Sequence, residues 1–310
     1  IYQNARTEIS IERGLGMSFK SGFVSIIGRP NAGKSTLLNS ILGEKVVIVS
    51  EKPQTTRNKI RGIKNMENAQ IVFLDTPGIH QAKGHLNEFM VKEAMSALED
   101  MDIIIYLVEA TGKIKDELFI IESLKKVRCP VLLGINKIDM VRKDSILPLM
   151  DEYSSAYPFR EIIPLSARKG EGMDELFRCI VELLPEGPKY FTEDILTDQT
   201  ERFVVAEIVR EKVFELTREE IPYSTAVIVE RFKENPGKGI ISISATINVE
   251  RDSQKGIIIG KGGAMLKEIG TRARIDIERL LGTKVYLELF VRVRKDWTKD
   301  AKSLKEFGYH

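Results

Sequence analysis

The sequence predicts an α/β protein with two domains: a doubly wound, mostly parallel sheet followed by a smaller α+β domain. Short runs rich in Ile and Val alternate with longer amphipathic stretches from about residue 20 to residue 184. These runs are apolar on both faces, which is typical of parallel strands covered by helices. After residue 200 the order of elements changes, and alternating apolar and polar residues predict half-buried strands.

The first domain is expected over residues 20–186. Its predicted strands are the apolar runs at 23–27, 71–74, 103–108, 131–135 and 162–164. Its predicted helices are the amphipathic stretches at 34–42, 88–99, 116–127 and 173–184. This alternation indicates a doubly wound domain. Residues 1–19 are set aside as an N-terminal extension, which derives either from expression of the protein or from a misassigned start.

The second domain is expected over residues 201–310, after a polar linker at 187–200. Pro185, Gly187 and Pro188 interrupt the earlier pattern and mark the linker. The second domain is predicted to contain a helix, two strands, two helices and a strand. These elements are expected at 202–217, 224–232, 239–250, 255–259, 264–281 and 284–294.

Composition excludes several classes of protein. The chain has 47 Lys and Arg against 45 Asp and Glu, so its net charge of +2 does not suit a globally basic nucleic-acid binder. Residues 255–295 nevertheless carry a net charge of +6, which leaves a local basic site open. Two cysteines exclude a disulfide scaffold and favour a reducing, cytosolic setting, and three histidines are too few for a histidine-based metal site. No apolar run approaches the ~18 residues of a membrane span.

Residues 28–35 read Gly-Arg-Pro-Asn-Ala-Gly-Lys-Ser and match the phosphate-binding loop G-x-x-x-x-G-K-[ST]. They follow a predicted strand and open a predicted helix, whose N-terminus favours a phosphate. Lys34 can reach the β- and γ-phosphates, and the Ser35 hydroxyl can ligate Mg²⁺. The expected nucleotide contacts in this segment are Gly28, Asn31, Ala32, Gly33, Lys34, Ser35 and Thr36.

Asp75 begins the motif Asp-Thr-Pro-Gly at the end of the second predicted strand. At that edge of the sheet, the Asp75 carboxylate can hold a water molecule on Mg²⁺. The N–H of Gly78, which ends the motif, can meet the γ-phosphate. Alone this tetrapeptide is an ordinary turn, so its meaning depends on the phosphate loop before it.

The motif Asn136-Lys137-Ile138-Asp139 follows the predicted strand at 131–135 and identifies the base. The Asp139 carboxylate can accept two hydrogen bonds from guanine that adenine cannot donate. Asn136 can join this loop to the phosphate loop, and the stem of Lys137 can lie over the base. Farther along the chain, the backbone of Ser166 and Ala167 can face guanine O6. The motif therefore predicts GTP and GDP rather than ATP.

These motifs in this order resemble the translation-factor-type GTPases over about residues 22–184. The resemblance implies Mg²⁺-dependent hydrolysis, with Thr56 as a Mg²⁺ ligand when GTP is bound and Thr55 as the alternative. The implied catalytic residues are Lys34, Thr56 and Gly78, and the implied metal ligands are Ser35, Thr56 and, through water, Asp75.

Ile79 occupies the position at which Ras-like proteins carry a water-orienting Gln, so a slow intrinsic rate is expected. Some GTPases with an apolar residue there use an Asn of the phosphate loop to hold K⁺. Asn31 stands at the matching position, and its role is left open between a K⁺ site and a purely structural one.

Gly260-Lys261-Gly262-Gly263 lies between two predicted helices and forms a G-x-x-G loop. Its glycines let the backbone approach phosphates closely, and Lys261 adds positive charge. The order of elements is that of a type II KH domain, which grips single-stranded RNA with this loop. Bases are expected to lie on residues 257–259 and on the strand at 239–249. The expected RNA-binding residues are Ile257, Ile258, Ile259, Gly260, Lys261, Gly262, Gly263, Lys267, Arg272 and Arg274.

One GTPase domain, a linker and a KH domain with an intact loop resemble the Era family of bacterial Ras-like GTPases over about residues 20–310. The match includes Gln54-Thr55-Thr56-Arg57. The resemblance implies binding to the 3′ end of 16S rRNA and association with the small ribosomal subunit. It also implies a monomeric cytoplasmic protein with peripheral attachment to the inner membrane surface.

Two alternatives are kept. A Der-like ribosome-assembly GTPase has two GTPase domains and a KH-like module without the G-x-x-G loop, so the single phosphate loop here argues against it. An RNA chaperone with a structural nucleotide site is the other alternative. Multiple-turnover release of phosphate distinguishes such a chaperone from an enzyme.

Overall fold

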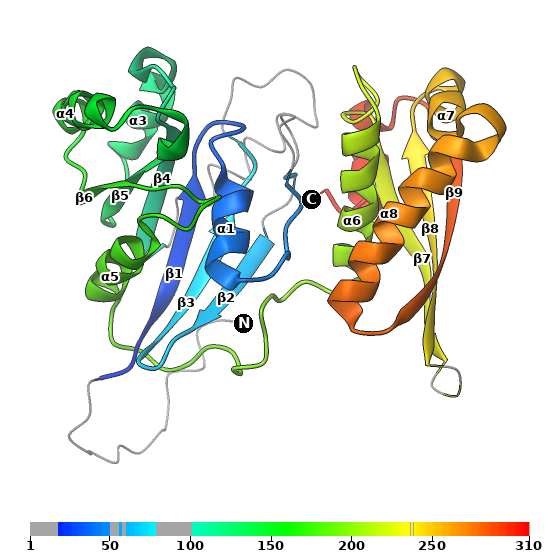
Figure 1. Ribbon diagram of the computed structural model, residues 1–310, viewed down its shortest axis with the longest axis horizontal. Helices are drawn as coiled ribbons and strands as arrows, with labels where there is room; N and C mark the ends of the chain where they lie inside the picture. The colour runs from blue at the N-terminus through cyan, green and yellow to red at the C-terminus, as the bar shows by residue number, and fades with distance from the viewer. Residues whose placement is uncertain are drawn as a thin grey trace.

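The structure is a computed structural model that describes residues 18–49, 56–57, 60–78, 101–235, 237 and 239–309. These residues form two domains joined by an extended linker (Figure 1). The predicted fold class is confirmed for both domains. The helix predicted at 88–99 lies outside the described residues.

The first domain is built on a six-stranded sheet in the order β2-β3-β1-β4-β5-β6. All neighbouring strands are parallel except β2 and β3, which are antiparallel. Every side chain of the interior strand β3 is buried, as expected for a strand covered on both faces. The strands are β1 (Lys20–Ile27), β2 (Ile60–Asn65), β3 (Ala69–Asp75), β4 (Ile103–Glu109), β5 (Val131–Asn136) and β6 (Glu161–Pro164).

Helices cover both faces of this sheet. One apolar cluster joins the sheet to α1 (Lys34–Leu42) and α5 (Met173–Leu183). A second cluster joins the opposite face to α3 (Leu118–Leu124) and α4 (Ile146–Ala156). Short 3₁₀ turns occur at Ile114–Asp116, Ile138–Met140 and Lys143–Ser145.

Three elements of the first domain differ from the sequence-based expectation. The helix predicted at 116–127 is a 3₁₀ turn followed by the shorter α3, which ends where Lys125 and Lys126 enter a turn. The strand β2 and the helix α4 were not predicted at all. The described strands otherwise begin and end within a few residues of the predicted bounds.

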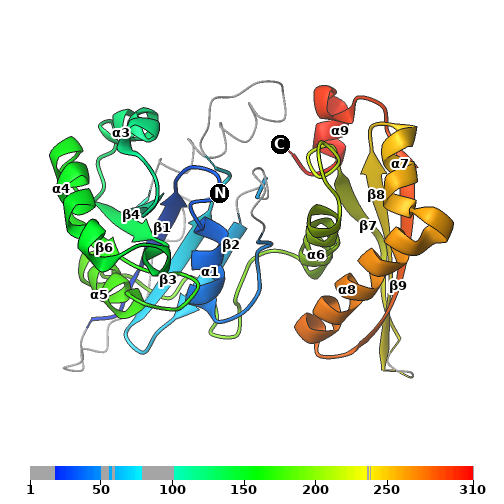
Figure 2. The same ribbon diagram turned by 45° about the horizontal axis from the view of Figure 1, so that its top comes forward.

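The second domain has a three-stranded sheet in the order β7-β8-β9, in which β8 is antiparallel to β7 and parallel to β9. The helices α6 and α8 pack on one face of this sheet, and α6 lies on the side toward the first domain (Figures 1 and 2). The elements are α6 (Glu201–Leu216), β7 (Ala226–Asn235), β8 (Ile240–Val249), α7 (Asp252–Ile259), α8 (Ala264–Leu281) and β9 (Lys284–Val293).

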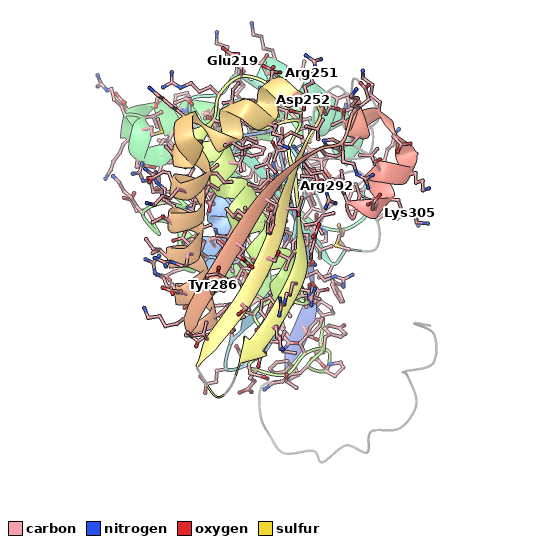
Figure 3. All side chains as sticks on the ribbon, turned by 90° about the vertical axis from the view of Figure 1, so that its right-hand side faces the viewer. Glu219, Arg251, Asp252, Tyr286, Arg292 and Lys305 are labelled. Atoms are coloured by element: carbon pink, nitrogen blue, oxygen red, sulfur yellow. The ribbon has the colours of Figure 1, made fainter. Side chains whose placement is uncertain are left out.

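Helix α8 shows why this sequence folds as it does. Ile269, Ala273 and Ile277 recur every four residues, lie on one face of the helix and are fully buried. The remaining helical positions are mostly polar and exposed. The sheet face turned away from the helices carries Tyr286 and Arg292 (Figure 3).

Residues at the C-terminal end of the chain form a separate small apolar core. Trp297 lies in a 3₁₀ turn, Trp297–Lys299, and packs with Leu304 of α9 (Ala301–Glu306) and with Tyr309. The indole N–H of Trp297 donates a 2.9 Å hydrogen bond to the carbonyl of Ser224. This end of the chain faces the first domain in both overall views (Figures 1 and 2).

The linker forms hydrogen bonds with the edge of the first sheet. The N–H of Ile63 in β2 donates to the carbonyl of Leu196 at 2.8 Å, and Gly62 and Thr197 form an antiparallel bridge. The Gln70 side chain donates to the carbonyl of Phe191 at 2.8 Å. The outer edge of β2 is therefore paired.

Within the part of the chain that the structure describes, none of the helices combines the length and the apolar character needed to cross a membrane.

Candidate nucleotide site and RNA-binding loop

The predicted phosphate loop connects β1 to α1 in a conformation that needs glycine. Gly28 has φ = 152°, and Gly33 has φ = 96°. A Cβ on Gly33 would lie 2.2 Å from Nδ2 of Asn136, so no other residue fits at this position. The glycines thus allow the loop to fold beneath the guanine motif, with the N-terminus of α1 at its end.

Lys34 is buried in the phosphate loop, with 6% of its surface exposed. Its Nζ donates hydrogen bonds of 3.0 Å to the carbonyls of Gly28 and Arg29. Burial lowers the pKa of Lys34 to about 8, although the charges of Asp75 and Glu117 oppose this shift. The fold therefore holds an ammonium group in a place where its charge is costly until an anion arrives.

The three predicted metal ligands converge beside Lys34. The Ser35 hydroxyl donates a 2.8 Å hydrogen bond to Oδ2 of Asp75, and the Thr56 hydroxyl donates to the same oxygen at 3.2 Å. The Ser35 and Thr56 hydroxyl oxygens lie 2.8 Å apart. These residues come from α1, from the segment before β2 and from the end of β3, so the fold alone brings them together.

The chemistry of this cluster fits Mg²⁺. Asp75 is fully buried, its Oδ1 has no hydrogen-bond partner, and burial raises its pKa. A buried carboxylate with one free oxygen, beside two hydroxyls, supplies the hard oxygen ligands that Mg²⁺ prefers. The described residues contain no cluster of three or more His, Cys, Asp or Glu, so phosphate and water oxygens would complete the shell.

Gly78 lies against the phosphate loop. A Cβ at this position would lie 2.6 Å from the backbone nitrogen of Pro30. Gly78 thus lies beside the phosphate loop, as its predicted contact with the γ-phosphate requires. Ile79 and Thr55 lie outside the described residues.

The guanine motif is tied to both neighbouring loops by Asn136. Its Nδ2 donates to the carbonyl of Ala32 at 2.8 Å, and its Oδ1 accepts from the N–H of Ala167 at 3.0 Å. Lys137 has φ = 65°, and its ammonium lies 2.9 Å from Oε2 of Glu109. The predicted phosphate and base contacts therefore form one continuous site.

Asp139 is held in place by the loop after β6. Its Oδ1 accepts a 2.7 Å hydrogen bond from the Ser166 hydroxyl, and this bond is the main cause that lowers the pKa of Asp139. The carboxylate is thus ionised at neutral pH and keeps acceptor capacity for two guanine donors. Asn31, with φ = 69°, shapes the phosphate loop, and Thr36 is the third residue of α1.

Glu117 is a residue of this region that the sequence analysis missed. It is 4% exposed and accepts a 2.6 Å hydrogen bond from the Tyr106 hydroxyl. Burial raises the pKa of Glu117, and the Arg29 guanidinium of the phosphate loop lies 3.9 Å away. A polar side chain at the start of a helix gives no sequence signal for such a contact.

The G-x-x-G loop of the second domain has the backbone that RNA binding requires. Gly260, Gly262 and Gly263 have φ values of 71°, 60° and 83°. A Cβ on Gly262 or Gly263 would meet no atom within 4 Å, so the space beside them is open. Lys261 is exposed in the 3₁₀ turn Lys261–Gly263 between α7 and α8.

The predicted floor for the bases needs correction at Ile258. Its side chain is 0% exposed and packs in the core of the second domain, so it cannot touch a base. Ile257 is 51% exposed and Ile259 is partly exposed. An α-helix has about 3.6 residues per turn, so these three consecutive side chains point in different directions.

The strand beside α7 also differs from the expectation. Bases are expected on the strand at 239–249, but this is the central strand β8, and α7 packs mainly along the edge strand β9. Lys267, Arg272 and Arg274 are exposed on α8, and Nε of Arg272 is paired with Glu268 at 2.7 Å.

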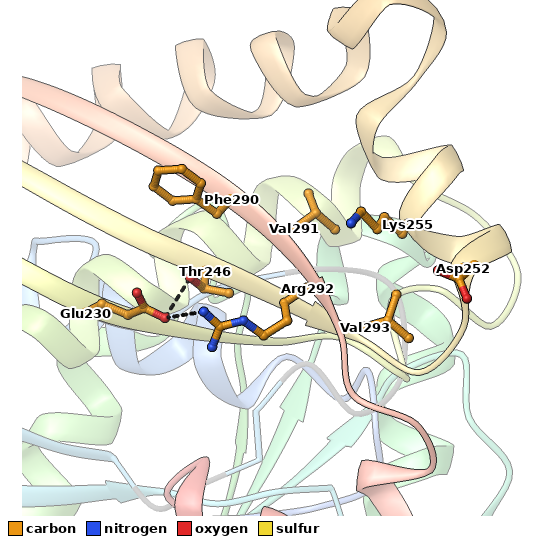
Figure 4. Close-up of a pocket in the computed structure, with 8 residues that line it drawn as sticks. All are labelled: Glu230, Thr246, Asp252, Lys255, Phe290, Val291, Arg292 and Val293. Atoms are coloured by element: carbon orange, nitrogen blue, oxygen red, sulfur yellow. Dashed lines mark hydrogen bonds and ion pairs between the residues drawn. The ribbon is translucent and has the colours of Figure 1, made fainter.

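A pocket of about 500 Å³ opens at the edge of β9 (Figure 4). Lys255 enters it from α7, and Phe290 and Arg292 line it from β9. Glu230 and Asp252 also line the pocket, and the Arg292 guanidinium lies 3.6 Å from Glu230. The exposed ring of Phe290 is therefore the surface on which a base could stack. The alternation of exposed and partly buried residues in β9 is the sequence signal that could have identified Phe290 and Arg292.

Known proteins resemble both domains. A family described as "50S ribosome-binding GTPase" matches residues 23–137, and a family described as "KH domain" matches residues 220–298. "GTPase Era" of Geobacter metallireducens is 61% identical over 292 residues, which cover 94% of this chain and 98% of that protein. The chain belongs to the Era family of GTPases. "GTPase Era" of Syntrophus aciditrophicus is 58% identical and covers 96% of this chain.

Two solved structures of Era proteins superpose on this chain with a TM-score of 0.90, at 46% identity over 94% of this chain and 99% of theirs. One is a single-residue variant of Aquifex aeolicus Era bound to GDP and AlF4⁻. The other is Era in complex with MgGDPNP and nucleotides 1506–1542 of 16S ribosomal RNA. The prediction of an Era family GTPase with a KH domain is thus confirmed, and the Der-like alternative is wrong.

The nucleotide site of this Era family member is arranged for hydrolysis of GTP. Lys34 and the N-terminus of α1 provide positive charge for the phosphates, where charge develops in the transition state. Asp139 is predicted to bind the guanine and Gly78 the γ-phosphate, and the hydrogen bond from Asn136 to Ala32 joins the loops that carry these predicted contacts. The individual site residues stay predictions that the experiments below test.

Proposed function

We propose that this chain is a GTP-dependent RNA-binding protein that acts on the 3′ end of 16S rRNA during assembly of the small ribosomal subunit. The observation that carries the proposal is the 260–263 loop, with three positive φ values and an exposed Lys261. An Era protein 46% identical to this chain binds nucleotides 1506–1542 of 16S ribosomal RNA together with MgGDPNP. The loop can hold the same kind of RNA through its phosphates.

The RNA is proposed to be single-stranded at the loop. The backbone of the 260–263 loop can approach phosphates, and the exposed side chains of Ile257 in α7 and Phe290 in β9 offer surface for unstacked bases. Paired bases cannot stack on such side chains. A duplex of the same sequence should therefore compete weakly.

The test is a fluorescence anisotropy titration of the full chain with a synthetic RNA of nucleotides 1506–1542. The variant Lys261→Asp/Gly262→Asp puts two carboxylates in the loop, and Asp tolerates positive φ better than most residues. Each lost phosphate contact weakens binding and flattens its salt dependence, so the titration is run at two salt concentrations.

A matched control is Ala301→Asp/Lys302→Asp, which makes the same change of charge at two exposed positions of α9. The control should bind RNA like the unchanged protein. Equal affinity of the loop variant and the unchanged protein would contradict the proposal. GTP binding should survive in both variants, because the nucleotide site belongs to the GTPase domain.

Mg²⁺ is proposed as the resident cofactor, held by the hydroxyls of Ser35 and Thr56 and, through water, by Asp75. When bound, the ion draws charge from the phosphate oxygens as a Lewis acid. The free oxygen of the buried Asp75 supports this assignment. Ser35→Ala should lower the apparent affinity for Mg²⁺ in the presence of GDP, measured by calorimetry.

Three further features stay predictions from family resemblance: K⁺ at Asn31, a monomeric state, and a cytoplasmic location with peripheral attachment to the inner membrane. Equal hydrolysis rates in K⁺ and Na⁺ buffers would leave Asn31 with no role in binding K⁺. Multiple-turnover phosphate release also tests the remaining alternative of a chaperone with a structural nucleotide.

A further inference from the structure

Arg57 belongs to the GTPase domain, but its side chain is buried among residues of the KH domain. Only 1% of its surface is exposed. Its Nη1 donates to the carbonyl of Thr225 at 2.9 Å and to the Tyr309 hydroxyl at 3.2 Å. Its Nη2 donates to the carbonyls of Pro222 at 3.1 Å and Tyr223 at 2.8 Å. Two segments far apart in the KH domain therefore hold one side chain of the other domain.

Three aromatic rings complete the binding site of this guanidinium. Cζ of Arg57 lies 6.0 Å from the ring centre of Phe214, 5.9 Å from that of Trp297 and 5.8 Å from that of Tyr309. Such rings attract a cation, most strongly where water is excluded. We call this group the Arg57 cage; its residues are Phe214, Pro222, Tyr223, Thr225, Trp297 and Tyr309.

The cage suits arginine and no other residue. Its hydrogen-bond acceptors are carbonyls and a hydroxyl, so the charge is stabilised by dipoles and ring faces. Several donors in one plane are needed to reach acceptors on both sides, and only a guanidinium provides them. A buried cation whose contacts were removed would be strongly unfavourable, so a displacement of Arg57 favours an accompanying adjustment of the cage.

The residue before Arg57 belongs to the nucleotide site. The Thr56 hydroxyl lies 3.2 Å from Oδ2 of Asp75 and 2.8 Å from Oγ of Ser35. Consecutive Cα atoms are about 3.8 Å apart, so Thr56 cannot change position without displacing the backbone of Arg57. One peptide unit thus separates a proposed Mg²⁺ ligand from a buried contact with the KH domain.

Lys45 and Val49, which precede Thr56 in the chain, also contact the KH domain. The N–H of Val49 donates to Oε1 of Glu211 at 3.2 Å, and Nζ of Lys45 lies 2.6 Å from Oε2 of Glu211. Lys45 also lies 3.2 Å from Asp276. Lys45 is 41% exposed, whereas the Glu211 side chain is 2% exposed. Among the described residues of the segment 45–57, Arg57 donates the largest number of hydrogen bonds to the KH domain.

We propose that Arg57 is the positioning residue through which the nucleotide site acts on the KH domain. Movement of Thr56 toward Mg²⁺ and the γ-phosphate shifts the guanidinium within its cage, and the cage adjusts to it. By thermodynamic linkage, RNA that prefers one arrangement of the KH domain changes nucleotide affinity by the same factor. This inference rests on the proposed function, because it names the regulation of RNA binding by nucleotide.

Trp297 makes the inference testable without RNA. It is the only tryptophan in the sequence, it is fully buried, and it belongs to the cage. Its fluorescence is measured for the full chain with GDP and with GDPNP. The unchanged protein should give different emission in the two states, and Arg57→Ala should abolish that difference while nucleotide affinity stays within about threefold, or ~0.7 kcal/mol.

Arg61→Ala is the matched control. Arg61 is a nearby arginine of β2 whose guanidinium lies 2.6 Å from Asp198 of the linker, and its loss should leave the fluorescence difference intact. Arg57→Lys keeps the charge but lacks the planar donors, so it should reduce the fluorescence difference between the two nucleotide states. This variant replaces Arg57→Ala in the test if Arg57→Ala does not fold. An unchanged difference in the folded Arg57 variants, or none in the unchanged protein, overturns the proposal.

RNA affinity provides the second measurement. The ratio of RNA dissociation constants with GDP and with GDPNP is compared between the unchanged protein and Arg57→Ala. Coupling between sites is commonly about 5- to 150-fold, and the variant should bring the ratio close to one. If the unchanged protein binds no RNA, the proposed function fails and the fluorescence result decides the inference. If both proteins show the same large ratio, the inference fails and the proposed function stands.

Discussion

Asn136 joins the guanine loop to the phosphate loop, because its Nδ2 donates a 2.8 Å hydrogen bond to the carbonyl of Ala32. Its Oδ1 also accepts from the N–H of Ala167, so one amide fixes three loops. The side chain is 2% exposed, so its hydrogen bonds to the two loops are shielded from solvent.

Asn136→Ala should weaken GDP binding by roughly 10- to 100-fold, because the guanine and phosphate loops lose the buried hydrogen bonds that hold them together and one such unpaired group costs about 1–3 kcal/mol. The measurement is the dissociation constant by calorimetry. Asn65→Ala, at a partly exposed amide of β2, is the control and should bind GDP normally. An unaltered affinity of Asn136→Ala would show that the loops hold together without it.

Asp139→Asn should exchange guanine specificity for xanthine specificity. The amide offers a donor where the carboxylate accepted, which suits the oxygen at C2 of xanthine and conflicts with the guanine amine. Affinity for GTP should fall by about 100-fold or more while affinity for xanthosine triphosphate rises. Asp144→Asn alters an exposed carboxylate paired with Arg142 and should affect neither. Retained GTP affinity in Asp139→Asn would exclude this residue as the base reader.

Lys34→Met should abolish nucleotide binding and remove a pH-dependent cost to the stability of the nucleotide-free protein. The pKa of Lys34 falls from 10.5 to about 8 on folding, so the charged form destabilises the folded state by about 3 kcal/mol at neutral pH. This penalty is complete below pH 8 and disappears as the pH rises toward 10.5.

Urea unfolding of the unchanged protein and of Lys34→Met should therefore differ more at about pH 7 than at about pH 9.5, by about 2 kcal/mol. Lys125→Met, which removes an exposed ammonium, is the control and should show no such dependence. A stability gap that is independent of pH would mean that the ammonium is not the source of the penalty.

Ile257 and Ile258 should separate RNA binding from folding. Ile258→Ala opens a cavity in the core of the KH domain and should cost about 2–5 kcal/mol of stability. Ile257→Ala removes exposed surface, so it should change stability by less than about 0.5 kcal/mol and weaken RNA binding instead. Thermal unfolding and RNA titration of both variants check this, and the reverse pattern would restore Ile258 to the RNA surface.

Local patterns in the sequence predicted most of the fold and of the nucleotide site. The strands of the GTPase domain are apolar on both faces, and the phosphate and guanine motifs each follow one of them, so periodicity and spacing were sufficient. Thr56 was placed by family resemblance, and the structure brings its hydroxyl to Asp75 and Ser35.

The missed elements have weak local signals. The strand β2 contains Gly62 and charged residues, and its pairing with β3 is set by the neighbouring sheet. The burial of Ile258 follows from the rotation of α7 against β9, which no window of sequence reveals. The cage of Arg57 joins residues more than 150 positions away in the chain, and an arginine in a polar loop usually lies in solvent.

The linker at 187–200 pairs with the outer edge of β2, where a further strand of the sheet would lie. The bridge between Gly62 and Thr197, with the bond from Ile63 to the carbonyl of Leu196, occupies the backbone groups of an outermost strand. In a GTPase fragment that ends before residue 187, the backbone groups at the outer edge of β2 would have no partner. Unpaired edge strands promote pairing between molecules. Such a fragment should form dimers or larger aggregates in light scattering, whereas one extended to residue 200 should stay monodisperse. The useful border for dividing this molecule therefore lies after the linker, although the chain leaves the last helix of the GTPase domain at Leu183.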